Sequence, residues 1–153
     1  MRAAPVWTCE RSIEVDVPAA FAWQYMTDVR NWDDPPATFE LDGPFADGAR
    51  GITRMPDQPP LFWTICDIDP GSGYTIVGGG FLEDAELRVR WHFEPVSDRK
   101  TRLTQRMELT GANAAAYVEA ISQTFGPNLE PGMRRIANSM ALAWASEGRP
   151  SES

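Results

Sequence analysis

The chain has 153 residues, of which 42% are hydrophobic and 24% are charged, and these values are typical of one folded domain rather than of a disordered chain. Its formal net charge of −8 argues against nucleic acid as a partner, because an acidic surface repels phosphate backbones. The sequence shows neither a signal peptide nor an apolar run near the roughly 18 residues of a membrane span, so we expect a cytoplasmic protein without membrane insertion.

Side chains suited to metal binding or nucleophilic catalysis are few. Cys9 and Cys66 are the only cysteines and lack the spacing of a metal site, so we expect two reduced thiols. His92 is the only histidine, and it shares its side of an alternating strand with charged residues, so we expect it to face water. A Ser/His/Asp or Cys/His arrangement would need this histidine to point inward. We therefore expect neither a metal nor a cofactor.

The N-terminal part predicts a strand followed by two short helices. Apolar and polar side chains alternate over residues 7–17, which is typical of a half-buried strand. Pro18 suits a first helical turn, because its missing N–H would be unsatisfied there anyway. Phe21 and Tyr25 follow at helical spacing, and Asp28 can cap a second short turn.

Residues 38–111 predict about six strands, separated by turns that are rich in glycine and proline. The last two strands form a hairpin, in which apolar side chains alternate with charged ones. Residues that lie opposite each other must share a face, and one register also brings opposite charges together. The cross-strand pairs of this register are Glu94 with Arg102, Arg88 with Glu108, and Trp91 with Gln105.

The C-terminal part predicts a long amphipathic helix, because apolar side chains recur there every three or four residues. These side chains are Tyr117, Ile121, Phe125, Leu129, Met133, Ile136, Met140 and Trp144. Gly126-Pro127 and Pro131-Gly132 interrupt the stripe, so we expect a kink or a break there. No repeat or linker divides the sequence, and we expect a single domain over residues 1–153 with an ordered core of about residues 7–147.

The order of these elements predicts an α+β fold, with helices on one side of a curved antiparallel sheet of six or seven strands. In this order the sequence resembles the START/polyketide cyclase superfamily (SRPBCC), which has the helix-grip fold, over about residues 7–147. The segments that carry the resemblance are "IEVDVPAAFAWQYMTDVRNW", "LDGPFADGARG", "ICDIDPGSGY", "RWHFEP" with "TRLTQRMELTG", and the C-terminal helix. The resemblance implies that the long helix closes a cavity lined by the concave face of the sheet. It implies a lipid, a sterol, a polyketide or another apolar molecule as the ligand.

Within such a fold we predict a ligand site that contains a few polar groups. Gln105 lies among Trp91 and Leu103 on the covered face, where an unpaired amide costs roughly 1–3 kcal/mol. It therefore binds a ligand carbonyl or hydroxyl, or else it is a satisfied core amide. Arg11 and Arg54 are polar residues on otherwise apolar strands. Either arginine offers charge to an anionic ligand group, unless it is merely exposed at a strand edge.

Large apolar side chains are predicted to line the cavity. They are Trp63, Trp91, Phe125, Leu129 and Met133. The alternative is that the same side chains fill an ordinary core. The resemblance implies that the two short helices support the far end of the long helix, so we interpret the rings of Phe21, Tyr25 and Trp32 as packing.

These observations favour a protein that binds a small hydrophobic or aromatic molecule, in a carrier or sensor role. Two alternatives remain open. One is a polyketide cyclase or dehydratase that folds a reactive chain by proximity, and the other is a protein-binding module, since relatives of this fold include co-chaperones. The sequence does not decide whether the protein is an enzyme, and it leaves the oligomeric state open, a homodimer included.

Overall fold

The computed structural model describes residues 4–32, 35–78 and 82–148. Its strands are β1 (Trp7–Val15), β2 (Thr38–Asp42), β3 (Arg50–Arg54), β4 (Leu61–Asp69), β5 (Gly73–Gly78), β6 (Glu86–Ser97) and β7 (Lys100–Thr110). Its helices are α1 (Ala19–Met26), the 3-10 helices η1 (Val29–Asn31) and η2 (Ala114–Tyr117), the long α2 (Val118–Ala143), and the π-helical turn η3 (Trp144–Gly148). This order of strands and helices is the one expected from the sequence.

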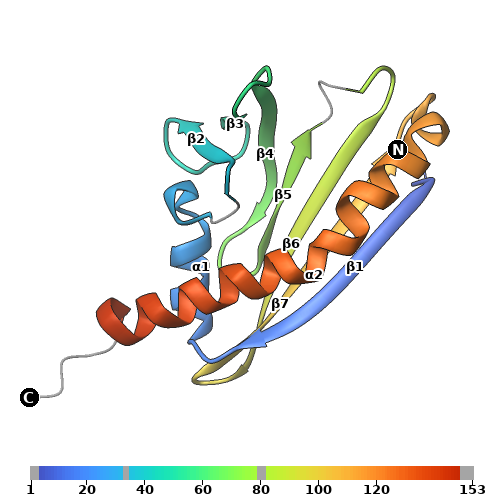
Figure 1. The fold of residues 1–153 in the computed structure, drawn as a ribbon. Helices are drawn as coiled ribbons and strands as arrows, with labels where there is room; N and C mark the ends of the chain where they lie inside the picture. Colours follow the sequence, from blue (N-terminus) through green and yellow to red (C-terminus); the bar gives the residue numbers. More distant parts are fainter. Residues whose placement is uncertain (1–3, 33–34, 79–81, 149–153) are drawn as a thin grey trace, which may run out of the picture.

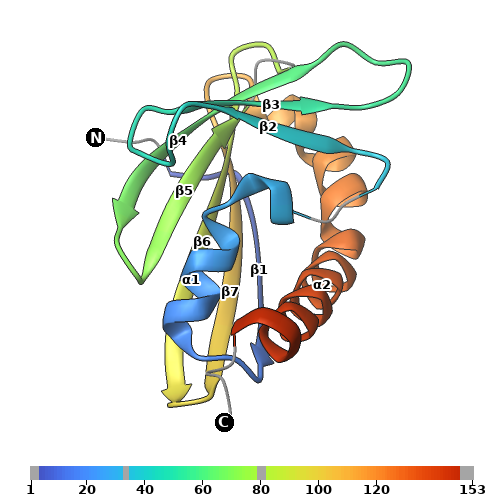
Figure 2. The ribbon, with the colours of Figure 1, turned by 90° about the vertical axis from the view of Figure 1, so that its left-hand side faces the viewer.

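The strands form one curved antiparallel sheet. Their order in space is β1-β7-β6-β5-β4-β3-β2, so the first strand pairs with the last. Figure 1 shows α2 running across the sheet beside β1, and Figure 2 shows α1 lying against β6 and β7. Seven strands that wrap around a long C-terminal helix confirm the predicted helix-grip architecture.

The β6–β7 hairpin has the register that the sequence predicted, and all three expected cross-strand pairs are present. On the convex face, the guanidinium of Arg102 donates to the carboxylate of Glu94 at 2.8 Å. On the concave face, Trp91 lies opposite Gln105. Because side chains alternate along a strand, this one register fixes which residues of both strands face the helices.

Local hydrogen bonds hold the two short helices in place. The buried hydroxyl of Thr101 on β7 donates to the carbonyl of Val17 at 2.8 Å, which ties the segment after β1 to the sheet. Asp28 caps η1 as expected, since its carboxylate accepts from the backbone N–H of Arg30 at 3.1 Å. The indole N–H of Trp32 donates to the last carbonyl of α1 at 2.9 Å. The rings near α1 therefore belong to a packed support, in agreement with the sequence-based interpretation.

α2 packs the predicted apolar stripe toward the sheet. Its buried residues are Ile121, Leu129, Met133, Ala137 and Met140. The helix is continuous through Pro127 and Pro131, so the break that we considered is not found. Figure 1 shows instead that α2 bends along its length. A proline inside a helix removes one hydrogen bond and crowds the preceding turn, which accounts for the bend.

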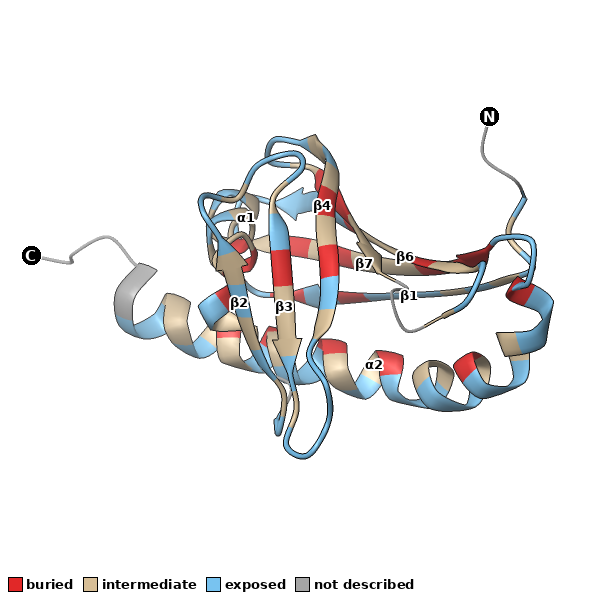
Figure 3. Cartoon of the chain, turned by 90° about the horizontal axis from the view of Figure 1, so that it is seen from above, coloured by how far each residue is buried: buried red, intermediate tan, exposed pale blue. Residues whose placement is uncertain are grey.

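Buried residues gather between the sheet and the helices, and Figure 3 marks them in red along the side of α2 that faces the sheet. The larger core cluster joins β1, β5, β6 and β7 to α1 and α2. A smaller cluster of Val29, Trp63 and Ile65 lies between η1 and β4. The core is thus concentrated on the concave side of the sheet.

Candidate functional site

A row of side chains crosses the concave face of the sheet. Tyr74 of β5 pairs with Trp91 of β6. Gln105 of β7 lies beyond Trp91, and Arg11 of β1 lies beyond Gln105. Neighbouring strands are about 4.8 Å apart, so these residues form a line roughly 14 Å long. We call them the concave row, and the row runs from the middle of the sheet to its β1 edge.

Burial decreases along the concave row. Tyr74 is fully buried and Trp91 is 4% exposed, whereas Gln105 is half-buried and Arg11 is exposed. The guanidinium of Arg11 donates to the backbone carbonyl of Glu10 at 2.8 Å. Within the described ranges, the amide of Gln105 has no hydrogen-bond partner. The accessible end of the row therefore offers an amide and a cation, next to buried aromatic rings.

Three concave side chains of β5, β6 and β7 are only half-buried. They are Ile76, Val89 and Gln105. Their strands β5, β6 and β7 lie inside the sheet rather than at its edges, and their concave side chains point to the side that α2 covers. Solvent therefore reaches part of the surface of each of these residues. Packing over the middle of the concave face is therefore incomplete.

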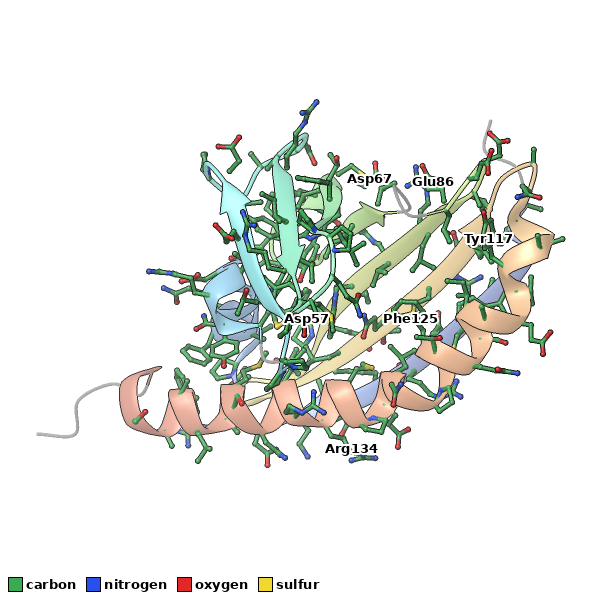
Figure 4. The ribbon with its side chains drawn as sticks, turned by 45° about the horizontal axis from the view of Figure 1, so that its top comes forward. Asp57, Asp67, Glu86, Tyr117, Phe125 and Arg134 are labelled. Atoms are coloured by element: carbon green, nitrogen blue, oxygen red, sulfur yellow. The ribbon has the colours of Figure 1, made fainter. Side chains whose placement is uncertain are left out.

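Phe125 of α2 faces the same region. It lies one helical turn from Ile121 and from Leu129, each 4% exposed, yet it is itself only half-buried. Figure 4 shows Phe125 on the side of α2 that is turned to the sheet. A partly exposed side chain between two buried neighbours of one helical stripe marks a gap in the contact between helix and sheet.

Tyr74 closes the inner end of the concave row, and the sequence reasoning did not single it out. Its ring contacts those of Phe45, Trp23 and Phe93, with centroids 5.0, 6.0 and 6.0 Å away. Its buried hydroxyl has no hydrogen-bond partner in the part of the chain that the structure describes. An unsatisfied buried polar group costs roughly 1–3 kcal/mol. Burial also raises the pKa of Tyr74 far above its usual value, so the hydroxyl stays protonated.

Trp63 packs among other groups at the far side of the sheet. Its indole N–H donates to the hydroxyl of Thr53 at 2.9 Å, and its ring stacks on Trp32 with centroids 5.3 Å apart. A Cβ atom at Gly51 would lie 2.0 Å from this ring, so the indole fits only because residue 51 has no side chain. Trp63 thus fills the smaller core cluster, which corresponds to the alternative that we considered for it.

The structure brings most of the predicted site residues to one side of the sheet. They are Trp91, Gln105, Phe125, Leu129 and Met133. Arg54 does not join them, because it is exposed on the convex side of β3 and pairs with Glu40. His92 is exposed, as expected.

The described residues contain no group of three or more histidine, cysteine or acidic side chains that could hold a metal ion. Cys9 and Cys66 are free thiols, each half-buried. Burial raises the pKa of Cys66, which leaves it a protonated and weakly reactive thiol at neutral pH. The chemistry of the concave row is therefore hydrogen bonding and ring stacking.

Two cavities lie mainly on the convex side. The larger, of about 410 Å³, is lined by Arg50, Phe62, Trp63, Thr64, Val77, Gly78, Ala85 and Glu86. The smaller, of about 220 Å³, is lined by Asp67, Thr75, Arg88, Arg90, Arg106 and Glu108. Each arginine of the smaller cavity donates to an oxygen of the chain at 2.7 to 2.9 Å. The charges of this second cavity are thus satisfied internally.

The sheet, the short helices after β1 and the long C-terminal helix together define a helix-grip protein with an aromatic concave face. The model of the family described as "Polyketide cyclase / dehydrase and lipid transport" matches residues 6–141, and the chain belongs to this family. No curated protein matches the sequence. None of the described helices is long and apolar enough to cross a membrane.

Solved structures confirm the fold at low sequence identity. A point mutant of norcoclaurine synthase from Thalictrum flavum, in complex with a transition-state analogue, is 16% identical with a TM-score of 0.71, over 95% of this chain and 100% of that one. The di-domain ARO/CYC BexL from the BE-7585A biosynthetic pathway is 18% identical with a TM-score of 0.72, over 90% of this chain but only 47% of BexL. A Thermobifida fusca protein solved by NMR is 18% identical with a TM-score of 0.68, over 95% of this chain and 99% of that one. Identities this low show the fold and not the activity.

Proposed function

We propose that this protein binds a small hydrophobic or aromatic molecule between the concave face of the sheet and α2. The molecule lies against Ile76 and Val89, next to Trp91 and the amide of Gln105, and Phe125 covers it from the helix. Leu129 and Met133, which are buried residues of α2, form the apolar wall of the site on the helix side. The role is that of a carrier or sensor, performed in the cytoplasm by one domain formed by residues 1–153.

The observation that carries this proposal is the incomplete packing over the middle of the concave face. Ile76 and Val89 are apolar, lie on interior strands and are half-buried. Apolar surface in a concave region gains about 25 cal/mol per Å² when a ligand removes it from water. The half-buried Phe125 provides the matching surface on the other side. Membership of a family described by polyketide chemistry and lipid transport supports a ligand of this kind.

A second candidate is a cyclase or dehydratase that acts on a polyketide-like molecule. The observation in its favour is that Arg11 and Gln105 are cross-strand neighbours on the concave side. Such neighbours could hold two carbonyl oxygens of one chain and bring its reacting carbons together. If this candidate is right, alanine at either position alters the distribution of products, whereas unchanged products would remove it.

A protein-binding module is the least supported candidate. The large hydrophobic side chains that are exposed within the described ranges are Val6, Phe62, Val96 and Leu142. They lie on four different segments of the chain and do not form one stripe. A contiguous apolar patch is what usually marks a protein interface.

The proposal is tested by filling the space over the concave face. Val89→Trp places a large ring at a half-buried concave position, and Val77→Trp places the same ring on the convex side, next to Ile76 on β5. The neutral fluorescent probe N-phenyl-1-naphthylamine reports binding, and thermal denaturation reports whether each variant is folded. We expect Val89→Trp to weaken probe binding at least tenfold, because the added ring occupies the ligand's space, and Val77→Trp to leave binding unchanged.

The reverse pattern would contradict the proposal. Loss of binding in Val77→Trp alone would place the molecule in the convex cavity of about 410 Å³ that Val77 lines. No binding to the unmodified protein would remove the proposed function for probes of this class.

A further inference from the structure

Tyr74 has a feature that packing alone does not explain. Its side chain is 0% exposed, and its hydroxyl has no hydrogen-bond partner among the described residues. The contacts with Phe45, Trp23 and Phe93 are all made by the ring. Phenylalanine would make the same ring contacts without the desolvation cost of a hydroxyl. The hydroxyl therefore needs another explanation.

The position of Tyr74 points to the proposed ligand. Tyr74 pairs directly with Trp91, so the two side chains are cross-strand neighbours on the concave face. Gln105 lies on the other side of Trp91. A flat molecule next to Trp91 therefore lies between two polar side chains, one half-buried and one fully buried.

The neighbouring strand leaves Tyr74 without a regular cross-strand partner on its β4 side. The β4–β5 register shifts between Cys66 and Asp69, which lie opposite Thr75 and Gly73. Bulges of this kind often re-aim a side chain next to a functional site. The side chain of Tyr74 is thus held by rings from α1 and from the loop after β2, with its polar end free of the chain's own donors and acceptors.

We propose that the hydroxyl of Tyr74 donates a hydrogen bond to an oxygen of the bound molecule, and that the ligand is an aromatic molecule bearing a carbonyl or a similar acceptor. This inference rests on the proposed function and narrows its ligand class, because hydrocarbons and plain acyl chains offer no such acceptor. The hydroxyl serves as a donor and not as a base, since burial keeps it protonated.

Two probes of the same shape test the inference. 2-Acetylnaphthalene carries a carbonyl, and 2-isopropenylnaphthalene has a CH2 group in place of that oxygen. We expect the unmodified protein to prefer the ketone, and Tyr74→Phe to lower its affinity for the ketone about tenfold while leaving the hydrocarbon unchanged. Tyr117→Phe is the matched control, because it also removes one tyrosine hydroxyl, which accepts from the backbone N–H of Glu83 at 2.9 Å. This control should keep the preference for the ketone.

A second readout covers the case in which Tyr74→Phe does not fold. The carbonyl stretch of bound 2-acetylnaphthalene in the infrared reports a hydrogen bond to the ketone. In the double variant Arg11→Leu/Gln105→Leu, which removes the other two donors of the concave row, we expect this stretch to stay at its hydrogen-bonded frequency. A stretch that moves to the value seen in an apolar solvent would overturn the role of Tyr74.

The outcomes separate this inference from the proposed function. If both probes bind and Tyr74→Phe leaves their affinity ratio unchanged, the hydroxyl is not a ligand donor, and the proposed function stands without it. Binding of neither probe to the unmodified protein would overturn both. A melting temperature of Tyr74→Phe equal to or above that of the unmodified protein is also expected, since the variant removes an unsatisfied group. A clear loss of stability would mean that the hydroxyl has a structural partner, contrary to the proposal.

Discussion

The two faces of the sheet differ in whether their polar side chains have hydrogen-bond partners within the chain. On the convex face, Arg88 and Arg106 each donate to a carboxylate of their own strand at 2.9 Å. On the concave face, the hydroxyl of Tyr74 and the amide of Gln105 have no partner among the described residues. The arginines of β6 and β7 on the convex face are therefore paired within the chain. The concave face retains unused hydrogen-bonding groups next to apolar rings, which is the composition of a small-molecule site.

The largest effect for testing this comparison is expected at Trp63, whose ring is packed in the smaller core cluster although the residue also lines the convex cavity of about 410 Å³. Its ring is 8% exposed, stacks on Trp32 and donates to Thr53. Trp63→Ala should lower the free energy of unfolding by about 3–5 kcal/mol, as measured by urea denaturation. A loss of unfolding free energy below about 1 kcal/mol, together with altered probe binding, would show that the ring of Trp63 lines open space on the concave side.

Two glycines give an intermediate effect of opposite sign. Gly51→Ala should destabilise the protein by about 1–3 kcal/mol, because the new methyl group would overlap the ring of Trp63. Gly132→Ala should stabilise it by about 0.5–1 kcal/mol, because alanine favours the helix and its Cβ has nothing within 4 Å. Denaturation curves of both variants measure this. Equal shifts in one direction would contradict the described packing of the two positions.

The smallest effect is expected on the convex face. Glu94→Gln removes the charge that Arg102 pairs with at 2.8 Å, but Arg102 keeps a second carboxylate, Glu14, at 3.1 Å. All three side chains are more than a third exposed, so we expect a loss below about 1 kcal/mol that shrinks further in 1 M salt. A larger loss of unfolding free energy that salt does not reduce would show that the ion pairs of the convex face contribute substantially to stability, contrary to this account.

The register of the β6–β7 hairpin could be predicted because two independent constraints agree there. Alternation and the pairing of opposite charges both favour Trp91 opposite Gln105, and the structure has this pair. The long apolar stripe likewise predicted α2, although its continuity through Pro127 and Pro131 depends on packing against β1. The fold could be predicted where several sequence signals indicate the same structure.

The details of the candidate site could not be predicted in the same way. The role of Tyr74 depends on a bulge in β4, which shifts the register without a clear sequence signal. Arg54 was predicted as a site residue. Which side of a five-residue strand faces the core depends on its pairing with the neighbouring strand, and here Arg54 pairs with Glu40 on the convex side. The exposure of Val89 and Phe125 depends on how α2 bends. These features arise from packing between elements, and the residue pattern of one strand or helix does not predict them.

The central claim is that a small apolar molecule binds between the concave face and α2. Intermolecular NOEs from 2-ethylnaphthalene to assigned methyl groups test it most directly, because Ile76 and Val77 are adjacent residues that face opposite sides of β5. The account predicts NOEs to Ile76, Val89 and Leu129 and none to Val77 or Leu142. NOEs to Val77 without any to Ile76 and Val89 would contradict it and would move the site to the convex face.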